Sequence, residues 1–482
     1  MPSRRTHVTA SAAQSELAVA LASLRTGLDL PEGFPEPVER EAEAAAAALT
    51  LPMTDLTGVP FVTIDPDGST DLDQAVHIER SGAGFRVRYA IADVPALVRP
   101  DGAVDIEARR RGQTIYAADG RIPLHPSAIG ERAGSLLAGV DRGAFVWELV
   151  LDAGGREVSV SLVRARVRSR RQWSYADAQA AVDDGSAPET LLLLKPVGLA
   201  RIECERLRGG ASLNAPDEEI VLREGAYTLE RRSPLPIEEW NAQISLLTGM
   251  AAARLMLDAR IGILRTMPPP AEEAVTSFRA QTTALGLPWA ADQPYGEYLR
   301  GLDHTDPRAL AVMQAATGLF RGAGYVVMDG EAPADPLQSA VAAPYAHTTA
   351  PLRRLVDRWV LVICEALSAG REVPAWARRS LTELPSIMGA SSRLGSQLNA
   401  ASIDRVEAAL LADRIGDEFE ATVLSVRGDT MTVQLAEPAV VASAPRPDGV
   451  QPGTVVRLCL ATADIPTGRS TFTTPGSSRA HE

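Results

Sequence analysis

Hydrophobic and polar positions alternate along much of residues 58–168, which predicts β-strands separated by turns. The expected strands cover residues 59–65, 74–80, 86–92, 145–151 and 157–168. Between the third and fourth of them lies a long connection, residues 93–143, that is rich in proline, glycine and arginine. This part of the chain is therefore predicted to be mainly β-structure.

Apolar residues recur with helical spacing on both sides of that region. Two alanine-rich segments, 11–25 and 37–49, flank a proline and glycine break near the N-terminus. Further helices are expected at 237–264, 351–369 and 371–415. Together with the strands, they predict an α/β (α+β) domain preceded by a short helical segment.

After Gly416 the alternation returns in residues 420–426, 430–435 and 454–460. Short strands with Gly/Asp and Pro/Gly turns over about 60 residues predict a small all-β barrel of the OB type. The last residues, rich in Ser, Thr, Gly and Arg, are expected to be disordered. The resulting organisation is a helical N-terminal segment at 1–52, an α/β domain at 53–412, a barrel at 416–473 and a tail at 474–482.

Composition sets the chemical context for these elements. The chain has 482 residues, 45% of them hydrophobic, and a formal net charge of −13, so nucleic-acid binding would have to use local patches. The three cysteines are far apart and form no CxxC motif, which favours a reducing, cytoplasmic environment over a disulfide framework or zinc site. We also expect no signal peptide and no association with a membrane, since no apolar run reaches the roughly 20 residues needed to cross one.

Four aspartates, Asp65, Asp67, Asp71 and Asp73, lie within nine positions directly after the apolar run 59–64. Carboxylates this close repel one another unless a cation holds them together or water solvates them. A divalent metal site at the end of a strand is therefore the first hypothesis.

Two alternatives for this cluster remain open. The spacing imitates the alternating ligands of a calcium loop, although Val76 stands where a bidentate glutamate belongs and Gly68 comes too early. A solvated polar turn between two strands is the simpler reading. Against that reading, the alternation across Leu72 sends the carboxylates of Asp71 and Asp73 to the same face.

Arginines 164, 166, 168 and 170 occupy alternate positions, so an extended strand would place them on one face along about 20 Å. This spacing favours contacts with a phosphodiester backbone, and Tyr175 follows closely as a possible stacking platform for single strands. The alternatives are a solvated edge strand for the arginines and core packing for the aromatic ring.

Another basic feature occurs in residues 345–358. Pro351 is predicted to open a helix, which would place Arg353 and Arg354 in its first turn, where positive charge opposes the helix dipole unless an anion binds. Arg353 would then stabilise negative charge developing on phosphorus. The alternative is an ordinary surface ion pair, either of Arg353 with Asp357 or of Arg354 with a neighbour of Arg358.

These motifs carry a family resemblance. The segment Thr-Ile-Asp-Pro-Asp-Gly-Ser-Thr-Asp-Leu-Asp-Gln-Ala at 63–75 resembles the active-site signature of the ribonuclease II family, the exoribonucleases with an RNB domain. Segments 89–94, 105–123 and 131–142 follow in the family's order, and Tyr-Ala-His-Thr-Thr-Ala-Pro-Leu-Arg-Arg at 345–354 resembles its arginine motif.

The resemblance implies an RNB-type catalytic domain, an OB-fold RNA-binding domain after it, and Mg²⁺-dependent (Mn²⁺ possible) 3′-to-5′ degradation of single-stranded RNA to nucleoside 5′-monophosphates. No small-molecule organic cofactor is implied, and we expect a monomer. The implied catalytic residues are Asp65, Asp71, Asp73 and Arg353, the metal ligands are Asp65, Asp71, Asp73 and Gln74, and the RNA-binding residues are Tyr116, Tyr175, Arg164, Arg166, Arg168 and Arg354.

The chain also departs from the family pattern. Gln74 replaces a carboxylate of the signature, which weakens metal binding through lower charge. The N-terminal segment is too short for the two cold-shock domains of the best-known members, and the barrel offers only Phe419 and Phe472 as aromatics. These departures keep two alternatives open: a catalytically weak or inactive RNA-binding protein on the same fold, and a calcium-stabilised structural protein.

Overall fold

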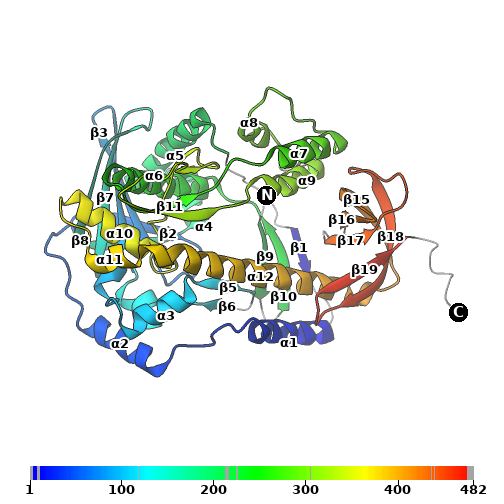
Figure 1. Ribbon diagram of the computed structural model, residues 1–482, viewed down its shortest axis with the longest axis horizontal. Coiled ribbons are helices and arrows are strands. Elements are labelled where there is room, and N and C mark those ends of the chain that lie inside the picture. Colours follow the sequence, from blue (N-terminus) through cyan, green and yellow to red (C-terminus); the bar gives the residue numbers. More distant parts are fainter. Residues whose placement is uncertain are drawn as a thin grey trace.

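The centre of the domain that follows the N-terminal segment is a closed five-stranded barrel in the computed structural model, which describes residues 4–7, 11–118, 120–211, 217–223, 226–303, 306–435, 437–438 and 440–474 (Figure 1). Its strands, in barrel order, are β2 (Phe61–Asp65), β3 (Gln74–Ser81), β4 (Gly84–Ala92), β7 (Asp141–Leu151) and β8 (Glu157–Ser174). All neighbours pair antiparallel except β2 and β8, which pair in parallel. The five predicted strands are thus confirmed, but closure of the sheet was not foreseen.

Helices cover the barrel and share its main apolar core. They are α4 (Tyr175–Asp184), α5 (Glu189–Arg208), α6 (Pro236–Ala259) and α10 (Leu355–Ser368). Trp147 from β7, Tyr89 from β4 and Trp359 from α10 are almost fully buried in this core. Burial of such large rings contributes strongly to stability, so the helices hold the barrel and the loops at its ends in place.

The long connection between β4 and β7 contains short elements that sequence patterns did not reveal. They are η1 (Val94–Ala96), α3 (Ala103–Arg111), β5 (Ile115–Ala117), β6 (Gly120–Ile122) and the π-helical turn η2 (Ala128–Ala133). Strands β5 and β6 form a hairpin in which Tyr116 lies opposite Arg121. Elements of three residues carry too little periodicity to be recognised in a sequence.

Two predicted helices need correction. The helix expected at 237–264 ends at Ala259, because Arg260 adopts a left-handed conformation (φ 53°) and residues 261–266 form strand β11 (Ile261–Thr266). The helix expected at 351–369 begins only at Leu355, so Arg353 and Arg354 precede it. By contrast, the helical reading of 371–415 is confirmed by α11 (Ala375–Ser380), η4 (Leu381–Glu383), α12 (Leu384–Leu411) and η5 (Ala412–Arg414).

Helix α12 runs along the molecule beneath the barrel and reaches the C-terminal sheet (Figure 1). The N-terminal helix α1 (Ser11–Gly27) packs on it through Leu17 and Leu21, while α2 (Glu36–Ala47) packs on α3. A three-stranded sheet in the order β1-β10-β9 lies near the same end. Its strands are β1 (Arg4–His7), β9 (Asp217–Arg223) and β10 (Ala226–Arg232).

Between the barrel and the C-terminal sheet, a helical subcluster encloses its own small core around Phe278, Trp289 and Tyr298 (Figure 1). Its elements are α7 (Glu272–Ala284), α8 (Tyr295–Arg300), α9 (Pro307–Ala316) and η3 (Thr317–Leu319). Short pairings complete this side: β11 with β12 (Gly324–Asp329), and β13 (Leu337–Gln338) with β14 (Ala343–Pro344).

The C-terminal sheet has five antiparallel strands in the order β17-β16-β15-β18-β19, and its two edge strands approach each other, so the sheet is nearly a closed barrel. The strands are β15 (Glu418–Arg427), β16 (Thr430–Leu435), β17 (Val441–Pro445), β18 (Val455–Asp464) and β19 (Arg469–Thr473). The predicted fold class, α/β followed by an all-β OB-like barrel, is confirmed. The predicted tail lies outside the described residues from 475 onward.

Candidate active site

Asp73 connects the start of β3 to a loop almost 280 positions further along the chain. Its side chain is only 5% exposed, its Oδ1 accepts a hydrogen bond from the Leu352 amide at 2.7 Å, and its Oδ2 lies 3.7 Å from Arg353 Nε. Burial raises the pKa of Asp73 well above its ordinary value, while the charge of Arg353 acts in the opposite direction. The two segments found separately in the sequence therefore meet in one site.

Asp65, at the end of β2, is a second, partly buried carboxylate of the site. Its Oδ2 is inaccessible to water and has no hydrogen-bond partner. Burial, together with the charge of Asp71, raises the pKa of Asp65 to about 7. An uncompensated carboxylate of this kind is costly, and such groups concentrate at functional sites.

Asp71 has a cationic partner that sequence reasoning missed. Arg121 of β6 donates to the carboxylate of Asp71 through Nη1, and through Nη2 it donates to Thr70 Oγ1 (3.0 Å) and to Glu131 Oε1 (2.5 Å). Its position opposite Tyr116 in the β5–β6 hairpin could have placed Arg121 near the site. That hairpin is too short to be predicted from the sequence. Arg121 neutralises one of the proposed metal ligands from within the chain.

Gln74 is also engaged. Its Nε2 donates to the carbonyl oxygen of Thr349 at 2.5 Å, which ties the start of β3 to the loop that carries Arg353. A carboxylate could not donate this hydrogen bond. The amide thus has a structural role whether or not its oxygen faces a cation.

The buried carboxylates decide between the alternatives for the aspartate cluster. A solvated turn is excluded, because the side chains of Asp71 and Asp73 are only 17% and 5% exposed. A calcium loop is disfavoured, because Asp73 is directed to Leu352 and Arg353 and away from its own loop.

The aspartate cluster offers oxygen donors to a divalent ion. Across the described part of the chain, no three His, Cys, Asp or Glu side chains converge closely enough to hold a metal. The orphaned oxygen of Asp65 and the buried carboxylate of Asp73 are nevertheless hard oxygen donors of the kind that Mg²⁺ prefers. Asp65 offers an oxygen without a partner, whereas Asp73 would share its carboxylate between the ion, Leu352 and Arg353. Asp71 and Gln74 are held by Arg121 and Thr349 in this arrangement.

The paired arginines at 353 and 354 have different environments. The Arg353 side chain is 43% exposed, so its guanidinium group is available to a ligand. Arg354 is only 17% exposed and forms two hydrogen bonds with the buried carboxylate of Asp357, at 3.0 and 2.9 Å. The ion-pair alternative therefore describes Arg354, although its partner is buried and not at the surface.

A buried network holds the Arg353 loop in place. The amide of Thr114 donates to the Arg353 carbonyl at 2.9 Å, and Leu355 donates to the carbonyl of Gly112 at 3.0 Å. Glycine is required at 112, where φ is 72° and a side chain would collide with Ser391. The loop is thereby hydrogen-bonded to the segment that joins α3 to β5.

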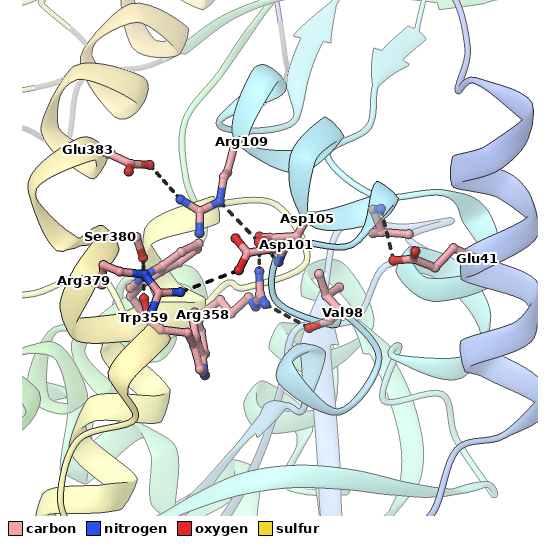
Figure 2. A network of polar contacts seen from close by, with 12 residues as sticks. Glu41, Val98, Asp101, Asp105, Arg109, Arg358, Trp359, Arg379, Ser380 and Glu383 are labelled. Carbon is pink, nitrogen blue, oxygen red and sulfur yellow. Dashed lines mark hydrogen bonds and ion pairs between the residues drawn. The ribbon is translucent and has the colours of Figure 1, made fainter.

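Figure 2 shows the polar side chains that join α3 to α10. Arg358 of α10, only 1% exposed, donates to Asp105 of α3 and to the Val98 carbonyl. Asp105 also accepts from Arg109, which reaches on to Glu383 at 2.8 Å. Each buried charge in this network meets an opposite charge, as a positioning scaffold requires.

Two tyrosines border the carboxylates. Tyr116 is 55% exposed on the β5–β6 hairpin and lies within the electrostatic influence of Asp71, Asp73 and Arg353, so its ring is available for stacking. Tyr175 begins α4 and packs partly against the main core. Burial, followed by the charge of Asp65, raises the pKa of Tyr175 to about 12.

The arginine row on β8 shares one face, as predicted, but its charges are satisfied internally. Arg164 contacts the buried Asp93 at 2.6–3.0 Å, and Arg166 and Arg168 contact other carboxylates at 2.6 Å, those of Asp55 and Asp141. Strand β8 is paired on both sides within a closed barrel, so the edge-strand alternative is wrong. Binding of RNA by this row stays a prediction. It requires that phosphates share the arginines with these carboxylates or displace the carboxylates from them.

The family relationship follows from a match over most of the chain. The RNB domain family matches residues 53–369, and the RNase II-type exonuclease C-terminal S1 domain matches residues 417–474. This chain belongs to the RNB domain family. The predicted family is therefore confirmed, and the five-stranded C-terminal sheet is its S1 domain.

Several curated RNB proteins are related in sequence. Ribonuclease R of Escherichia coli (strain K12) is 27% identical over 438 residues, which cover 84% of this chain and 51% of that protein. The exosome complex exonuclease dis3 of Schizosaccharomyces pombe is 29% identical over 323 residues, covering 61% of this chain and 32% of dis3. The chain thus spans about half or less of the length of these relatives.

Solved structures share the RNB fold. Mycoplasma genitalium RNase R in complex with ribose methylated single-stranded RNA superposes with a TM-score of 0.83 at 18% identity, over 95% of this chain and 78% of that one. Yeast Ssd1, described as a pseudonuclease, gives a TM-score of 0.67 at 15% identity, over 91% of this chain and 56% of Ssd1. At these identities the likeness establishes the fold alone.

Proposed function

We propose that this RNB protein is a divalent-metal-dependent exoribonuclease that degrades single-stranded RNA from the 3′ end to nucleoside 5′-monophosphates. The observation that carries the proposal is the meeting of the partly buried Asp65 and the buried Asp73, both of raised pKa, with the half-exposed Arg353. RNA-bound RNase R structures and exonucleases among the relatives support it.

Each group of the site has a role in this chemistry. Asp65 and Asp73 would hold Mg²⁺ or Mn²⁺, which when bound activates water and offsets charge on the phosphate. Arg353 places a guanidinium group where it stabilises the negative charge that develops on phosphorus. The exposed ring of Tyr116 would stack on a base near the 3′ end and thereby orient the terminal phosphodiester.

The second candidate function is RNA binding without turnover. Two observations favour it: Arg121 occupies the carboxylate of Asp71, and Gln74 uses its amide to hold Thr349. The fold shared with the pseudonuclease Ssd1 is compatible with such a protein.

Incubation of the full chain with a 5′-labelled, unstructured oligoribonucleotide and Mg²⁺ separates the two candidates. We expect a ladder that shortens from the 3′ end, that disappears with EDTA, and that is absent with the matching deoxyribonucleotide. Intact RNA accompanied by a mobility shift would instead establish the binding protein. Internal cuts at early times would contradict exonucleolytic action.

A further inference from the structure

A second charged pocket lies outside the candidate active site, where the turn between β7 and β8 packs against α5 and α6. The cavity has a volume of about 410 Å³. It is lined by four arginines, one glutamate, one cysteine and three apolar side chains: Arg156, Arg201, Arg208, Arg254, Glu157, Cys204, Leu207, Leu247 and Met250. Such a concentration of positive charge is unexpected in a chain with a net charge of −13.

Arg201 is the unusual member of this pocket. Three described arginines are buried: Arg111 and Arg358 each contact a carboxylate, whereas Arg201, only 4% exposed, contacts none. Its Nη1 donates to the Gly155 carbonyl at 2.8 Å, and its Nε is buried without a partner. An unpaired buried guanidinium group costs several kcal/mol in stability, on the order of the penalty for any uncompensated buried ion.

No carboxylate forms an ion pair with Arg201, although Glu157 and Glu205 act on its charge from further away. Glu157 forms an ion pair with Arg254, and Glu205, one turn along α5, contacts Arg300. Arg208 makes only long hydrogen bonds of 3.4 Å to the Val341 carbonyl, and Arg156 has no ion pair within the described ranges. Three arginines of the pocket are thus without a carboxylate partner.

The backbone brings the turn that carries Arg156 close to Arg201 on α5. Gly155 has φ +76°, and a Cβ there would lie 2.8 Å from the Ala200 Cβ, so only glycine lets the turn approach α5 this closely. The turn thereby places Arg156 in the lining of the same cavity as Arg201, and the apolar side chains of Leu247 and Met250 complete the lining.

We propose that this pocket binds the phosphate group of a small anion, either free phosphate or a phosphate monoester. Planar guanidinium groups donate paired hydrogen bonds to phosphate oxygens and are the preferred partners of such groups. The cavity volume falls in the usual range for small-molecule sites, and the apolar lining leaves room for an organic substituent. The proposal is independent of any nuclease activity.

Calorimetry and thermal unfolding of the full chain at constant ionic strength test the proposal, with inorganic phosphate, adenosine 5′-monophosphate and adenosine as probes. We expect phosphate or the monophosphate, but not adenosine, to bind and to raise the melting temperature. Comparison of the first two probes tells whether the pocket takes the free anion or the ester. If adenosine bound with the same affinity as adenosine 5′-monophosphate, recognition of the phosphate group would be refuted.

Variants locate the site. We expect Arg201→Met and Arg156→Ala each to weaken phosphate binding by about 10-fold or more, since each removes a charge-assisted hydrogen bond. Arg206→Gln is the matched control on the same helix: Arg206 is paired with Glu203 and Glu297, and its loss should change binding less than about 2-fold. Wild-type affinity in both Arg201→Met and Arg156→Ala would refute the site. If Arg201→Met does not fold, the exposed Arg156→Ala decides the question alone.

Discussion

Two groups of buried charge in the RNB domain differ in how they are compensated. In the network of Figure 2, Arg358 and Asp105 are almost completely buried and contact each other directly, and the other carboxylate oxygen of Asp105 accepts two further hydrogen bonds. In the candidate site, Asp65 has an oxygen without any partner, and the charged group nearest to Asp73 is 3.7 Å away and half-exposed.

The difference distinguishes charged side chains that stabilise the fold from charged side chains that are available for catalysis. A buried ion pair positions the helices or strands that it joins, and removal of one partner leaves the other as an uncompensated buried charge. Uncompensated carboxylates instead lower stability, and a fold retains them where a ligand supplies the missing positive charge. The first four variants below would break or sharpen this distinction, from the largest expected effect to the smallest.

Asp105→Asn should have the largest effect, on stability. Loss of the carboxylate leaves Arg358 buried without its counter-charge, so the free energy of unfolding should fall by about 3–5 kcal/mol. Chemical denaturation measures the change. Asp101→Asn is the control, since Asp101 is 74% exposed and has a positive φ that asparagine tolerates. An Asp105→Asn protein as stable as the control would show that the network is not a scaffold.

Arg353→Gln should act on turnover and not on folding. We expect cleavage at saturating RNA to slow by about 100- to 1,000-fold, as for loss of one donor to a developing oxyanion, while RNA affinity changes less than about 5-fold. Single-turnover kinetics with a parallel binding measurement separate the two quantities. Arg40→Gln, which removes an exposed arginine of α2, provides the control. Equal losses in rate and affinity would reassign Arg353 to backbone contact.

The raised pKa of Asp65 should make the free energy of unfolding depend on pH in metal-free buffer. Its pKa is raised to about 7 in the folded chain from an ordinary value of 3.8, so the folded state binds the proton more tightly. Its contribution is therefore fully present below about pH 4 and is lost as pH rises to about 7. Relative to Asp65→Asn, the wild type should lose roughly 3 kcal/mol of unfolding free energy over this interval. A constant difference between the two proteins across the interval would contradict the uncompensated carboxylate.

Arg121→Gln should tighten metal binding, because the substitution frees Asp71 from its internal counter-ion. We expect Mn²⁺ affinity, measured by calorimetry without RNA, to rise by about 10-fold, the equivalent of one modest ion pair. Arg132→Gln removes the same charge from a nearby surface pair with Glu43 and is the control. Arg121→Lys keeps the positive charge but loses the planar guanidinium group that contacts Asp71, so it should also tighten Mn²⁺ binding. If this variant instead had wild-type Mn²⁺ affinity, the effect of Arg121→Gln would be due to long-range charge alone.

The sequence was most informative where periodicity was long or a motif was dense. Five barrel strands, the helices at 371–415 and the OB-like C-terminal sheet could be predicted because their apolar faces repeat over several turns or pairs. The closure of the barrel could not, since the parallel pairing of β2 with β8 is a contact between residues about 110 positions apart. Arginine 260 ended a helix through a backbone conformation that no apolar pattern encodes.

The candidate site was predictable in its residue types and not in their partners. The sequence pattern identified Asp65, Asp73 and Arg353 as site residues, but the positions of Arg121 beside Asp71 and of Thr349 beside Gln74 depend on tertiary packing. The same limit applies to the arginines of β8: their shared face follows from strand periodicity, whereas their carboxylate partners come from distant segments.

Asp73→Asn tests the central claim most directly, because it removes the charge at the point where the two motifs meet and keeps the side-chain shape. Cleavage of a 5′-labelled oligoribonucleotide and binding of the same RNA by anisotropy are measured in parallel with Mg²⁺. We expect cleavage to fall by about 1,000-fold or more with RNA binding and melting temperature retained. Undiminished 3′-to-5′ shortening by Asp73→Asn would contradict the assignment of this site.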